Sequence, residues 1–344
     1  MKKDKVRILI AGIGGASLGT EILKSLLLEG ETYHIVGCDI SPLAYGHYQS
    51  GFSKTYHVDV NHYTDSLIEI CKKERIQLII PGGERPLSLL SKAKSDIDAL
   101  GVQLIANSDP VNENCSDKQK TFSLLERLGF EVPATLTPDN FQDLKTISYP
   151  CVVKPATGTG GSDSVFLAGN RQEAELYIQY LQLNGKTPIV QEYISEDEGE
   201  FTVGVLSLPN GKVVGSVAMQ RIFHTKLSVF SKTQNGLISS GYSQGLIDDF
   251  PLVCELAERI ASKINSRGPI NIQGRVRKGT LIPFEINPRF SASSYLRALA
   301  GFNEIHYYIQ CLLGNTLPLP KVSKPGYYLR SLSEQYVPKE KVIN

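Results

Sequence analysis

Residues 269–289 read PINIQGRVRKGTLIPFEINPR. An apolar, β-branched stretch lies on each side of the turn at Gly279, and this pattern predicts two strands that pair as a hairpin. Successive side chains of a strand point to opposite faces, so residues two positions apart share a face. The two strands can therefore place Gln273, Glu285 and Asn287 around one point.

These three side chains indicate a magnesium site. Mg²⁺ prefers oxygen ligands, usually one or two carboxylates together with water and substrate phosphates. The carboxylate of Glu285, flanked by two amide oxygens, suits a site that also holds phosphates. Arg289 follows the strand and offers a fixed cationic fork to a phosphoryl group. The alternative is a polar strand end that only caps the sheet, although Glu, Asn and Arg are rarely grouped for that purpose.

A second cluster suits the binding of a triphosphate. Lys154 ends an apolar strand, where a buried lysine is costly unless an anion or a carboxylate receives it. The loop of small residues that follows can bring several backbone N–H groups against phosphate oxygens. Its candidate phosphate-binding residues are Gly158, Thr159, Gly160, Gly161 and Ser162. A surface lysine before a flexible loop is the alternative. Lys118 can reach an α-phosphate, but taken alone it is more often an ordinary helix lysine.

A third cluster suits a nucleoside. The strand that ends at Gln191 and Glu192 can present a backbone carbonyl and N–H to the edge of an adenine, while Tyr193 and Ile194 cover its ring. Glu200, on the next strand, is placed to bond a ribose hydroxyl. We expect the acidic residues between these two strands to form a solvated turn instead.

The first hundred or so residues alternate strands with helices, which predicts a Rossmann-like domain with a parallel sheet and helices on both faces. The expected strands are Val6–Ala11, His34–Cys38, Gln77–Ile80 and Val102–Ala106, and the expected helices include Tyr63–Lys73 and Leu87–Leu100. The glycine turn after the first strand is either a phosphate site or, as we favour, a tight turn. The dinucleotide fingerprint fails because position 17 is Ser, and a Walker A loop fails because Thr20 stands where Lys is required.

The pattern then changes to an α+β arrangement with a largely antiparallel sheet. The expected strands are Cys151–Lys154, Val165–Ala168, Ile189–Tyr193, Glu200–Leu208, Val213–Met219, Ile270–Val276 and Leu281–Ile286. The expected helices start at Ser116 or Asp117 and at Glu173, Phe250 and Ser294.

Composition excludes several classes of protein. Lys and Arg number 36 against 35 Asp and Glu, for a net charge of +1, so neither a nucleic-acid groove nor an anionic membrane surface is expected as a partner. No apolar run approaches the roughly 20 residues of a membrane span. The six cysteines are scattered singly, which argues against a zinc site or a disulfide framework. We expect a soluble, cytoplasmic protein.

In this order, the motifs resemble those of the ATP-grasp superfamily, and most of all its branch with the large subunit of carbamoyl-phosphate synthase and related amino-acid ligases. The resemblance covers residues from about 115 to 300, and Glu285-Ile286-Asn287-Pro288-Arg289 is its strongest motif. It implies a Rossmann-like pre-ATP-grasp domain over 1–112, a small lid subdomain with the glycine-rich flap over 113–190, a large subdomain with the metal site over 191–320, and a tail over 321–344.

The resemblance also implies an activity: ATP-dependent joining of a carboxylate to an amine through an acyl phosphate, with release of ADP and phosphate. It implies ATP and two Mg²⁺ ions as cofactors, with Mn²⁺ able to substitute. Lys118, Lys154 and residues 158–162 would contact phosphates, residues 191–194 and Glu200 would hold the nucleoside, and Arg289 and Lys154 would be catalytic.

The substrates are expected to be a small carboxylate and an amine, and homodimers are usual among such enzymes. The candidate substrate-binding residues are Glu84, Arg85, Arg221, His224 and Lys226, each as compatible with an ordinary surface position. Three alternatives remain: an enzyme that forms carboxyphosphate or carbamoyl phosphate, a non-catalytic ATP-binding regulatory protein, and a dehydrogenase. The dehydrogenase ranks last because it leaves the later motifs unexplained.

Overall fold

The computed structural model describes residues 5–15, 17–138, 141–158 and 164–343. The chain divides into two compact units. The first contains Met1–Asn107, Arg289–Lys324 and Ser331–Asn344, and the second contains Ser108–Pro288 and Pro325–Arg330. The predicted Thr159, Gly160, Gly161 and Ser162 lie outside the described residues.

The first unit contains a five-stranded sheet in the order β3-β2-β1-β4-β5, and all its neighbouring strands are parallel. Its strands are β1 (Val6–Ala11), β2 (Tyr33–Asp39), β3 (Lys54–His57), β4 (Leu78–Pro81) and β5 (Gln103–Leu104). The Rossmann-like, parallel architecture is therefore confirmed. The sequence pattern missed β3 because this edge strand is short and largely exposed, so it carries no apolar signal.

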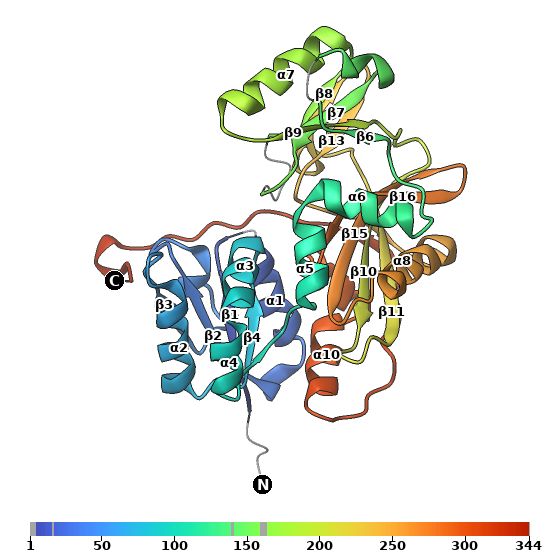
Figure 1. The fold of residues 1–344 in the computed structure, drawn as a ribbon. Coiled ribbons are helices and arrows are strands. Elements are labelled where there is room, and N and C mark those ends of the chain that lie inside the picture. Colours follow the sequence, from blue (N-terminus) through green and yellow to red (C-terminus); the bar gives the residue numbers. More distant parts are fainter. Residues whose placement is uncertain (1–4, 16, 139–140, 159–163, 344) are drawn as a thin grey trace. The chain divides into compact units, whose positions relative to one another are not determined.

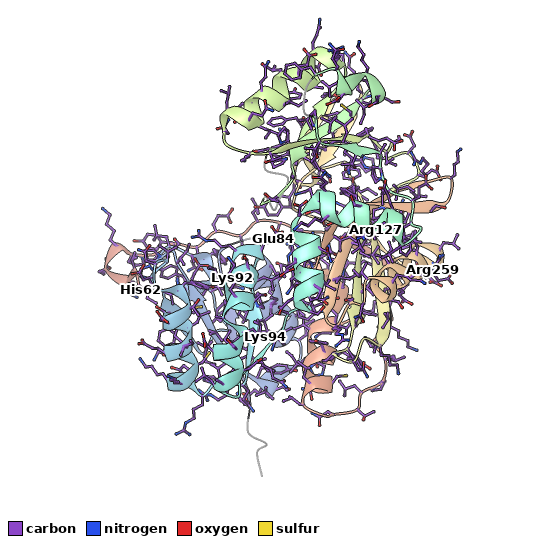
Figure 2. The ribbon with its side chains drawn as sticks, viewed as in Figure 1. His62, Glu84, Lys92, Lys94, Arg127 and Arg259 are labelled. Carbon is purple, nitrogen blue, oxygen red and sulfur yellow. The ribbon has the colours of Figure 1, made fainter. Side chains whose placement is uncertain are left out.

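Helices cover this sheet. They are α1 (Leu18–Leu27), α2 (Tyr63–Glu74), α3 (Glu84–Lys92) and α4 (Lys94–Ala99), joined by α9 (Ser294–Leu299) and α10 (Glu304–Leu312) from the other end of the unit. Short 3₁₀ turns occupy Gly30–Thr32, Tyr45–His47 and Lys339–Lys341. Helix α1 buries Ile22, Leu23 and Leu26, and α9 and α10 pack against it. Figure 2 shows Glu84 and Lys92 on α3.

The second unit begins with α5 (Asp109–Ser116) and α6 (Lys118–Arg127) and contains a four-stranded antiparallel sheet. This sheet has the order β6-β9-β7-β8, from β6 (Thr135–Leu136), β9 (Pro188–Glu192), β7 (Cys151–Pro155) and β8 (Phe166–Ala168). Helix α7 (Arg171–Leu183) packs on this sheet (Figure 1). Its buried residues Ala174, Ile178 and Leu181 enter the core there. A 3₁₀ turn occupies Asp143–Thr146.

A six-stranded antiparallel sheet forms the rest of the second unit, in the order β16-β15-β10-β11-β14-β17. Its strands are β10 (Glu200–Ser207), β11 (Val213–Arg221), β14 (Gly245–Ile247), β15 (Pro269–Arg277), β16 (Thr280–Asn287) and β17 (Gly326–Tyr328). Helix α8 (Pro251–Lys263) packs on β10 and β11. A hairpin of β12 (Val229–Thr233) and β13 (Gly236–Ser239) follows the 3₁₀ turn Lys226–Ser228.

The register of β15 and β16 confirms the predicted hairpin. Gln273 lies opposite Glu285, and Asn271 lies opposite Asn287, so all four polar side chains share one face. The residues between them, such as Ile272 and Ile286, point into the core beneath α8. The core therefore fixes this hairpin from one side while its other side carries the polar groups.

Two further findings concern the described residues. None of their helices is both long enough and apolar enough to cross a membrane. All six cysteines are unpaired thiols.

Candidate active site

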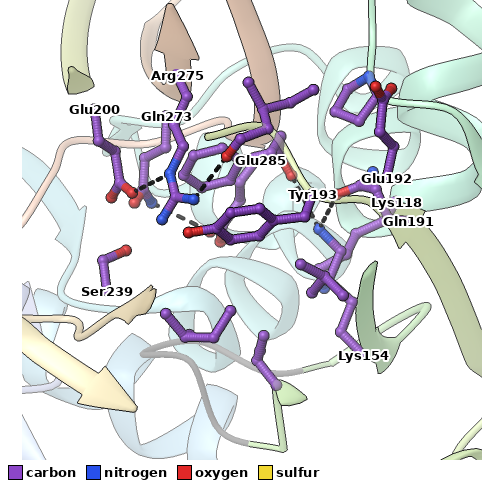
Figure 3. Close-up of a pocket in the computed structure, with 16 residues that line it drawn as sticks. Lys118, Lys154, Gln191, Glu192, Tyr193, Glu200, Ser239, Gln273, Arg275 and Glu285 are labelled. Carbon is purple, nitrogen blue, oxygen red and sulfur yellow. Dashed lines mark hydrogen bonds and ion pairs between the residues drawn. The ribbon is translucent and has the colours of Figure 1, made fainter. Parts of the chain in front are cut away.

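One pocket of the second unit gathers most of the predicted site residues (Figure 3). Its free volume is about 80 Å³. The predicted residues that line it are Lys118, Lys154, Gln191, Glu192, Tyr193, Ile194, Glu200, Gln273 and Glu285. They come from α6, β7, β10, β15 and β16, and from β9 with the two residues that follow it, so the pocket lies between the two larger sheets of this unit.

Lys154 is the buried cation of the pocket. Its side chain leaves β7, only 5% of the residue is exposed, and its Nζ donates hydrogen bonds to Gln191 Oε1 (2.7 Å) and to the Phe284 carbonyl (3.2 Å). Burial, and then the nearby charge of Lys118, lower the pKa of Lys154 to about 7, although Glu285 opposes this shift. No carboxylate among the described residues forms a salt bridge with this ammonium, so an anion entering the pocket would stabilise its charged form.

An irregularity in β16 supplies one of these acceptors. The pairing of β15 with β16 shifts between Gln273, opposite Glu285, and Gly274, opposite Pro283. Phe284 is therefore the extra residue of a β-bulge, and such a residue leaves the regular ladder of hydrogen bonds. Its carbonyl is consequently available to Lys154.

Lys118 begins α6 next to the loop after β7. The Asp117 carboxylate caps the helix by accepting from the backbone N–H groups of Gln119 (2.9 Å) and Lys120 (3.2 Å), which confirms Asp117 as the predicted cap. The Lys118 N–H donates to the Ala156 carbonyl at 3.0 Å. These contacts hold both lysines at one pocket, although they come from segments far apart in the sequence.

The end of β9 is fixed by side-chain contacts. Gln191 is buried, and its side-chain Nε2 donates to Thr135 Oγ1 at 2.9 Å. Its side-chain Oε1 accepts the hydrogen bond from Lys154. Glu192 accepts from Arg277 Nη1 (2.5 Å) and from the Ala134 N–H (3.1 Å), and its own N–H donates to the Ala134 carbonyl (2.8 Å). The Glu192 N–H is thus already bonded, and adenine contact by this segment stays a prediction.

Tyr193 forms one wall of the pocket, as Figure 3 shows. The guanidinium carbon of Arg275 lies 4.7 Å from the centre of its ring. The Tyr193 hydroxyl donates to Glu196 and accepts from the Leu237 N–H at 2.9 Å. Burial raises the pKa of Tyr193 to about 12, so the hydroxyl keeps its proton at neutral pH. One side of the ring already carries a cation, so a base that packed on Tyr193 would use the remaining surface.

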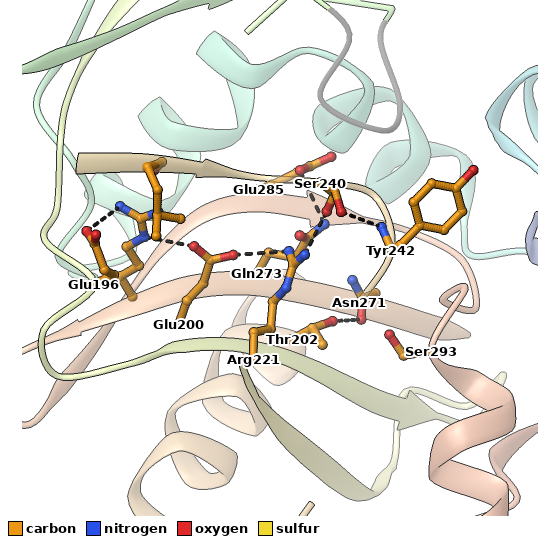
Figure 4. Close-up of polar contacts among 12 residues, drawn as sticks. Glu196, Glu200, Thr202, Arg221, Ser240, Tyr242, Asn271, Gln273, Glu285 and Ser293 are labelled. Carbon is orange, nitrogen blue, oxygen red and sulfur yellow. Dashed lines mark hydrogen bonds and ion pairs between the residues drawn. The ribbon is translucent and has the colours of Figure 1, made fainter. Parts of the chain in front are cut away.

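Glu200 is fully buried between two arginines, and Figure 4 shows it beside Arg221. Its carboxylate accepts from Arg221 Nη1 at 3.1 Å and from Arg275 Nε at 2.8 Å. Burial acts to raise the pKa of Glu200, but the charges of Arg221 and then Arg275 outweigh it and lower the pKa. Ribose binding by Glu200 stays a prediction, and its carboxylate already has two strong partners.

Arg275 is the residue that the sequence analysis missed. It donates from Nη1 to the Ile194 carbonyl (2.7 Å) and from Nη2 to the Leu237 carbonyl (2.9 Å), besides contacting Glu200 and Tyr193. A signal was present, because Arg275 lies two residues after Gln273 on the same strand and therefore on the same face.

The predicted metal ligands lie together. Glu285 accepts from Gln273 Nε2 and from Asn287 Nδ2, each at 3.2 Å. Among the described residues there is no cluster of three or more His, Cys, Asp or Glu that could hold a metal, so a cation here would depend on amide and phosphate oxygens. One carboxylate with two amides is a set of donors that fits Mg²⁺, provided that each amide turns its oxygen toward the ion. The terminal amide torsion permits that rotation.

The other predicted residues are placed elsewhere. Arg289 belongs to the first unit, where its Nη2 donates to Glu84 Oε1 at 2.9 Å. Arg221 is buried in the second unit and occupied by Glu200, so its use in substrate binding stays a prediction. Lys226 is exposed and lies outside the residues that line the pocket. Gly158, at the start of the predicted flap, has a left-handed φ of +83°.

Comparison with family models gives two matches. Residues 115–293 match the model described as "ATP-grasp domain". Residues 8–105 match the model described as "PylC-like, N-terminal domain".

Comparison with curated proteins finds large chains of carbamoyl phosphate synthase. The chain is 21% identical over 336 residues to that of Halomonas eurihalina, covering 91% of this chain and 30% of the relative. It is 22% identical over 358 residues to that of Vibrio cholerae, covering 98% of this chain and 31% of the relative. The chain thus spans about a third of the length of these relatives.

Solved structures share the fold at low identity. The L-amino acid ligase of Bacillus licheniformis has a TM-score of 0.65 at 18% identity, over 94% of this chain and 76% of that chain. The ADP complex of N5-carboxyaminoimidazole synthetase from Staphylococcus aureus has a TM-score of 0.68 at 16% identity, over 94% and 82%. Biotin carboxylase from Campylobacter jejuni has a TM-score of 0.66 at 17% identity, over 93% and 74%.

The matched ATP-grasp region spans most of the second unit, including the pocket with its paired lysines and its carboxylate–amide cluster. The fold of both units agrees with the solved structures. The chain belongs to the ATP-grasp family.

Proposed function

We propose that the protein is an ATP-dependent ligase that joins a carboxylate, of the amino-acid type, to an amine through an acyl phosphate. The observation that carries this proposal is the pocket in which Lys154 lies buried beside Lys118 and faces Glu285. A buried ammonium without a carboxylate partner favours an anion. The carboxylate–amide cluster opposite it favours a cation. A nucleotide polyphosphate with Mg²⁺ satisfies both needs together.

In this proposal the chain acts mainly by positioning charge. Lys118 and Lys154 bind phosphate oxygens, and Glu285, Gln273 and Asn287 hold Mg²⁺, which supplies neutralisation of phosphate charge when bound. An oxygen of the substrate carboxylate attacks the γ-phosphorus, and ADP leaves. The amine then attacks the acyl carbon, and phosphate leaves. Such transfers require alignment and electrostatic stabilisation rather than a protein nucleophile.

The nucleoside is assigned to the segment from Gln191 to Ile194, with Glu200 as the candidate for the ribose. The free volume of about 80 Å³ is several times the roughly 10–15 Å³ that one water needs by the same measure. Arg289 is assigned to the transferring phosphoryl group, and in the present structure it pairs with Glu84.

The substrate class rests on similarity as well as on chemistry. A neighbour of the same fold is an L-amino acid ligase, which supports an amino-acid substrate. Formation of carboxyphosphate from bicarbonate is the second candidate, because another neighbour is a biotin carboxylase domain solved with MgADP, ADP and bicarbonate. That structure is described as a dimer, which supports a homodimer here. A non-catalytic ATP-binding protein is disfavoured because it would not need both the candidate metal ligands and the arginine assigned to the phosphoryl group.

The experiment that tests this proposal is release of ADP and phosphate from MgATP. The panel contains amino acids, dipeptides, sugar acids and bicarbonate, each alone and paired with amines. Release that requires one acid and one amine supports the ligase. Release with bicarbonate alone supports the carboxyphosphate enzyme, and bound ATP without turnover across the panel contradicts both. Glu255→Gln, an exposed change on α8, is the matched control for variants of Glu285.

A further inference from the structure

A second cavity lies within the first unit, at the carboxyl ends of the parallel strands. Its volume is about 240 Å³, far more than the roughly 10–15 Å³ that one water needs by the same measure. Gly12 and Gly14 come from the turn after β1, and Gly82 and Gly83 come from the turn after β4. Asp39, the last residue of β2, also lines the cavity. Strand β1 lies between β2 and β4, so the order of the strands in the sheet reverses direction at β1. Ligands of open α/β sheets bind at such a crevice.

Glycines allow the backbone segments around this cavity to pack closely together. A Cβ at Gly82 would lie 2.0 Å from the Gly12 carbonyl oxygen, and a Cβ at Gly19 would lie 1.9 Å from the same atom. Any side chain at either position would clash. Glycine at these two positions is therefore required for the observed packing against the turn after β1.

The electrostatics of the cavity are mixed. Helices α1 and α3 both begin at it, and neither N-terminus has a side-chain cap. Their first N–H groups carry partial positive charge, and Arg85 in the first turn of α3 adds a full charge. Asp39 contributes a negative charge that is held by the N–H groups of Ile13 (2.8 Å) and Ser41 (3.0 Å). A carboxylate has about four acceptor positions, so two remain for a ligand.

Tyr63 provides an independent sign of a ligand. This lining residue is only 6% exposed, and its buried hydroxyl has no hydrogen-bond partner among the described residues. A buried hydroxyl without a partner is unfavourable, so a polar ligand atom here would be stabilised. The remaining walls are apolar and include Ile40, Val60 and Leu89.

We infer that this cavity binds an α-amino acid with an apolar side chain. The helix N-termini and Arg85 receive the carboxylate, and Asp39 receives the ammonium group. Tyr63 donates its hydroxyl hydrogen to the ligand, while the apolar walls cover the side chain. An amino acid bound here would be a substrate of the proposed ligase. Only its use as a substrate rests on the proposed function, because binding itself does not require turnover.

The test is calorimetric titration of the full chain, without nucleotide, using L-leucine as the probe. 4-Methylpentanoate, which lacks the ammonium group, and 3-methylbutylamine, which lacks the carboxylate, are expected to bind at least tenfold more weakly. Inorganic phosphate tests for a general anion site. Weak binding of both analogues supports the inference, whereas equal binding of phosphate or of 4-methylpentanoate overturns it.

Variants test the individual contacts. Arg85→Ala is expected to weaken L-leucine binding tenfold or more, and Tyr63→Phe several-fold. Lys92→Ala removes an exposed cation of the same helix and is expected to leave binding unchanged (Figure 2). Thermal unfolding of each variant checks that it is folded. Unchanged binding in both folded Arg85 and Tyr63 variants overturns the inference.

The two proposals fail in different ways. If L-leucine binds and neither ADP nor phosphate is released with any acid, the cavity stands and the ligase activity falls. If amino acids drive turnover with the same KM in Arg85→Ala and Tyr63→Phe, the ligase stands and the cavity assignment falls.

Discussion

Replacing Glu200 by Gln is expected to destabilise the second unit strongly. Glu200 is fully buried, and its carboxylate holds Arg221 at 3.1 Å and Arg275 at 2.8 Å. The two guanidinium groups are themselves almost inaccessible, with 1% and 6% of their side chains exposed. The amide of Gln keeps the shape but removes the negative charge, so two buried cations lose their counter-ion.

The size of the effect follows from this geometry. Breaking one buried ion pair by removing one partner costs about 3–5 kcal/mol, because an uncompensated charge stays buried. For a protein of 150–250 residues, each kcal/mol lowers Tm by roughly 2–4 °C. A fall in Tm of roughly 6–20 °C is therefore expected, measured by calorimetry or circular dichroism. Glu255→Gln, an exposed change on α8, is expected to stay within about 0.5 kcal/mol of the wild type.

The pH dependence gives a second signature of the same residue. The pKa of Glu200 is lowered in the folded protein, because the charges of the two arginines outweigh burial. Its stabilising contribution is therefore complete above the unfolded pKa of about 4.3 and is lost as the pH falls through the folded pKa. The difference in stability between wild type and Glu200→Gln should shrink over that acid range. A fall in Tm below about 2 °C at neutral pH, or a difference that does not change with pH, would refute the reasoning.

Three further predictions concern the nucleotide pocket and its hairpin. The pKa of Lys154 is about 7 in the free pocket, and a bound phosphate should raise it. ATP binding should therefore be accompanied by uptake of a proton. The affinity for ATP should fall by up to about tenfold per pH unit above pH 7. Calorimetry in buffers of different ionisation enthalpy measures this uptake, and Lys154→Met should abolish it; an unchanged uptake in that variant contradicts the assignment. Glu285→Ala should lower kcat by at least about 10²-fold, with Glu255→Gln as control, and wild-type turnover would exclude Glu285 from the metal site. Gly279 has a φ of +75° in the turn between β15 and β16, so Gly279→Ala should cost about 1 kcal/mol in urea unfolding, and no loss would contradict that backbone strain.

The hairpin of β15 and β16 shows how much of the site could be predicted. Alternation along each strand was enough to place Gln273 with Glu285 and Asn287, because one face of the hairpin is apolar and must enter the core. The bulge at Phe284 was not predicted. No residue in that segment demands it, yet it frees the carbonyl that receives Lys154.

Contacts between distant segments were the other limit. Glu200 lies 21 residues from Arg221 and 75 from Arg275, and it meets them only because β10 lies between β11 and β15. Sequence alone made Glu200 a candidate for a ribose hydroxyl because its partners were not visible. Helix α5 was missed for a local reason: its polar sequence, with only Val111 buried, gives a weak periodic signal.

An acyl phosphate formed from the substrate carboxylate would leave an oxygen atom of that carboxylate in the phosphate released. The acid that drives ADP release is labelled with ¹⁸O in its carboxylate and incubated with MgATP and the amine, and the released phosphate is examined by ³¹P NMR. We expect one ¹⁸O atom in each phosphate released, because the attacking oxygen leaves with the phosphoryl group when the amine displaces it. Phosphate without label, with both ¹⁸O atoms left in the organic product, would rule out an acyl phosphate.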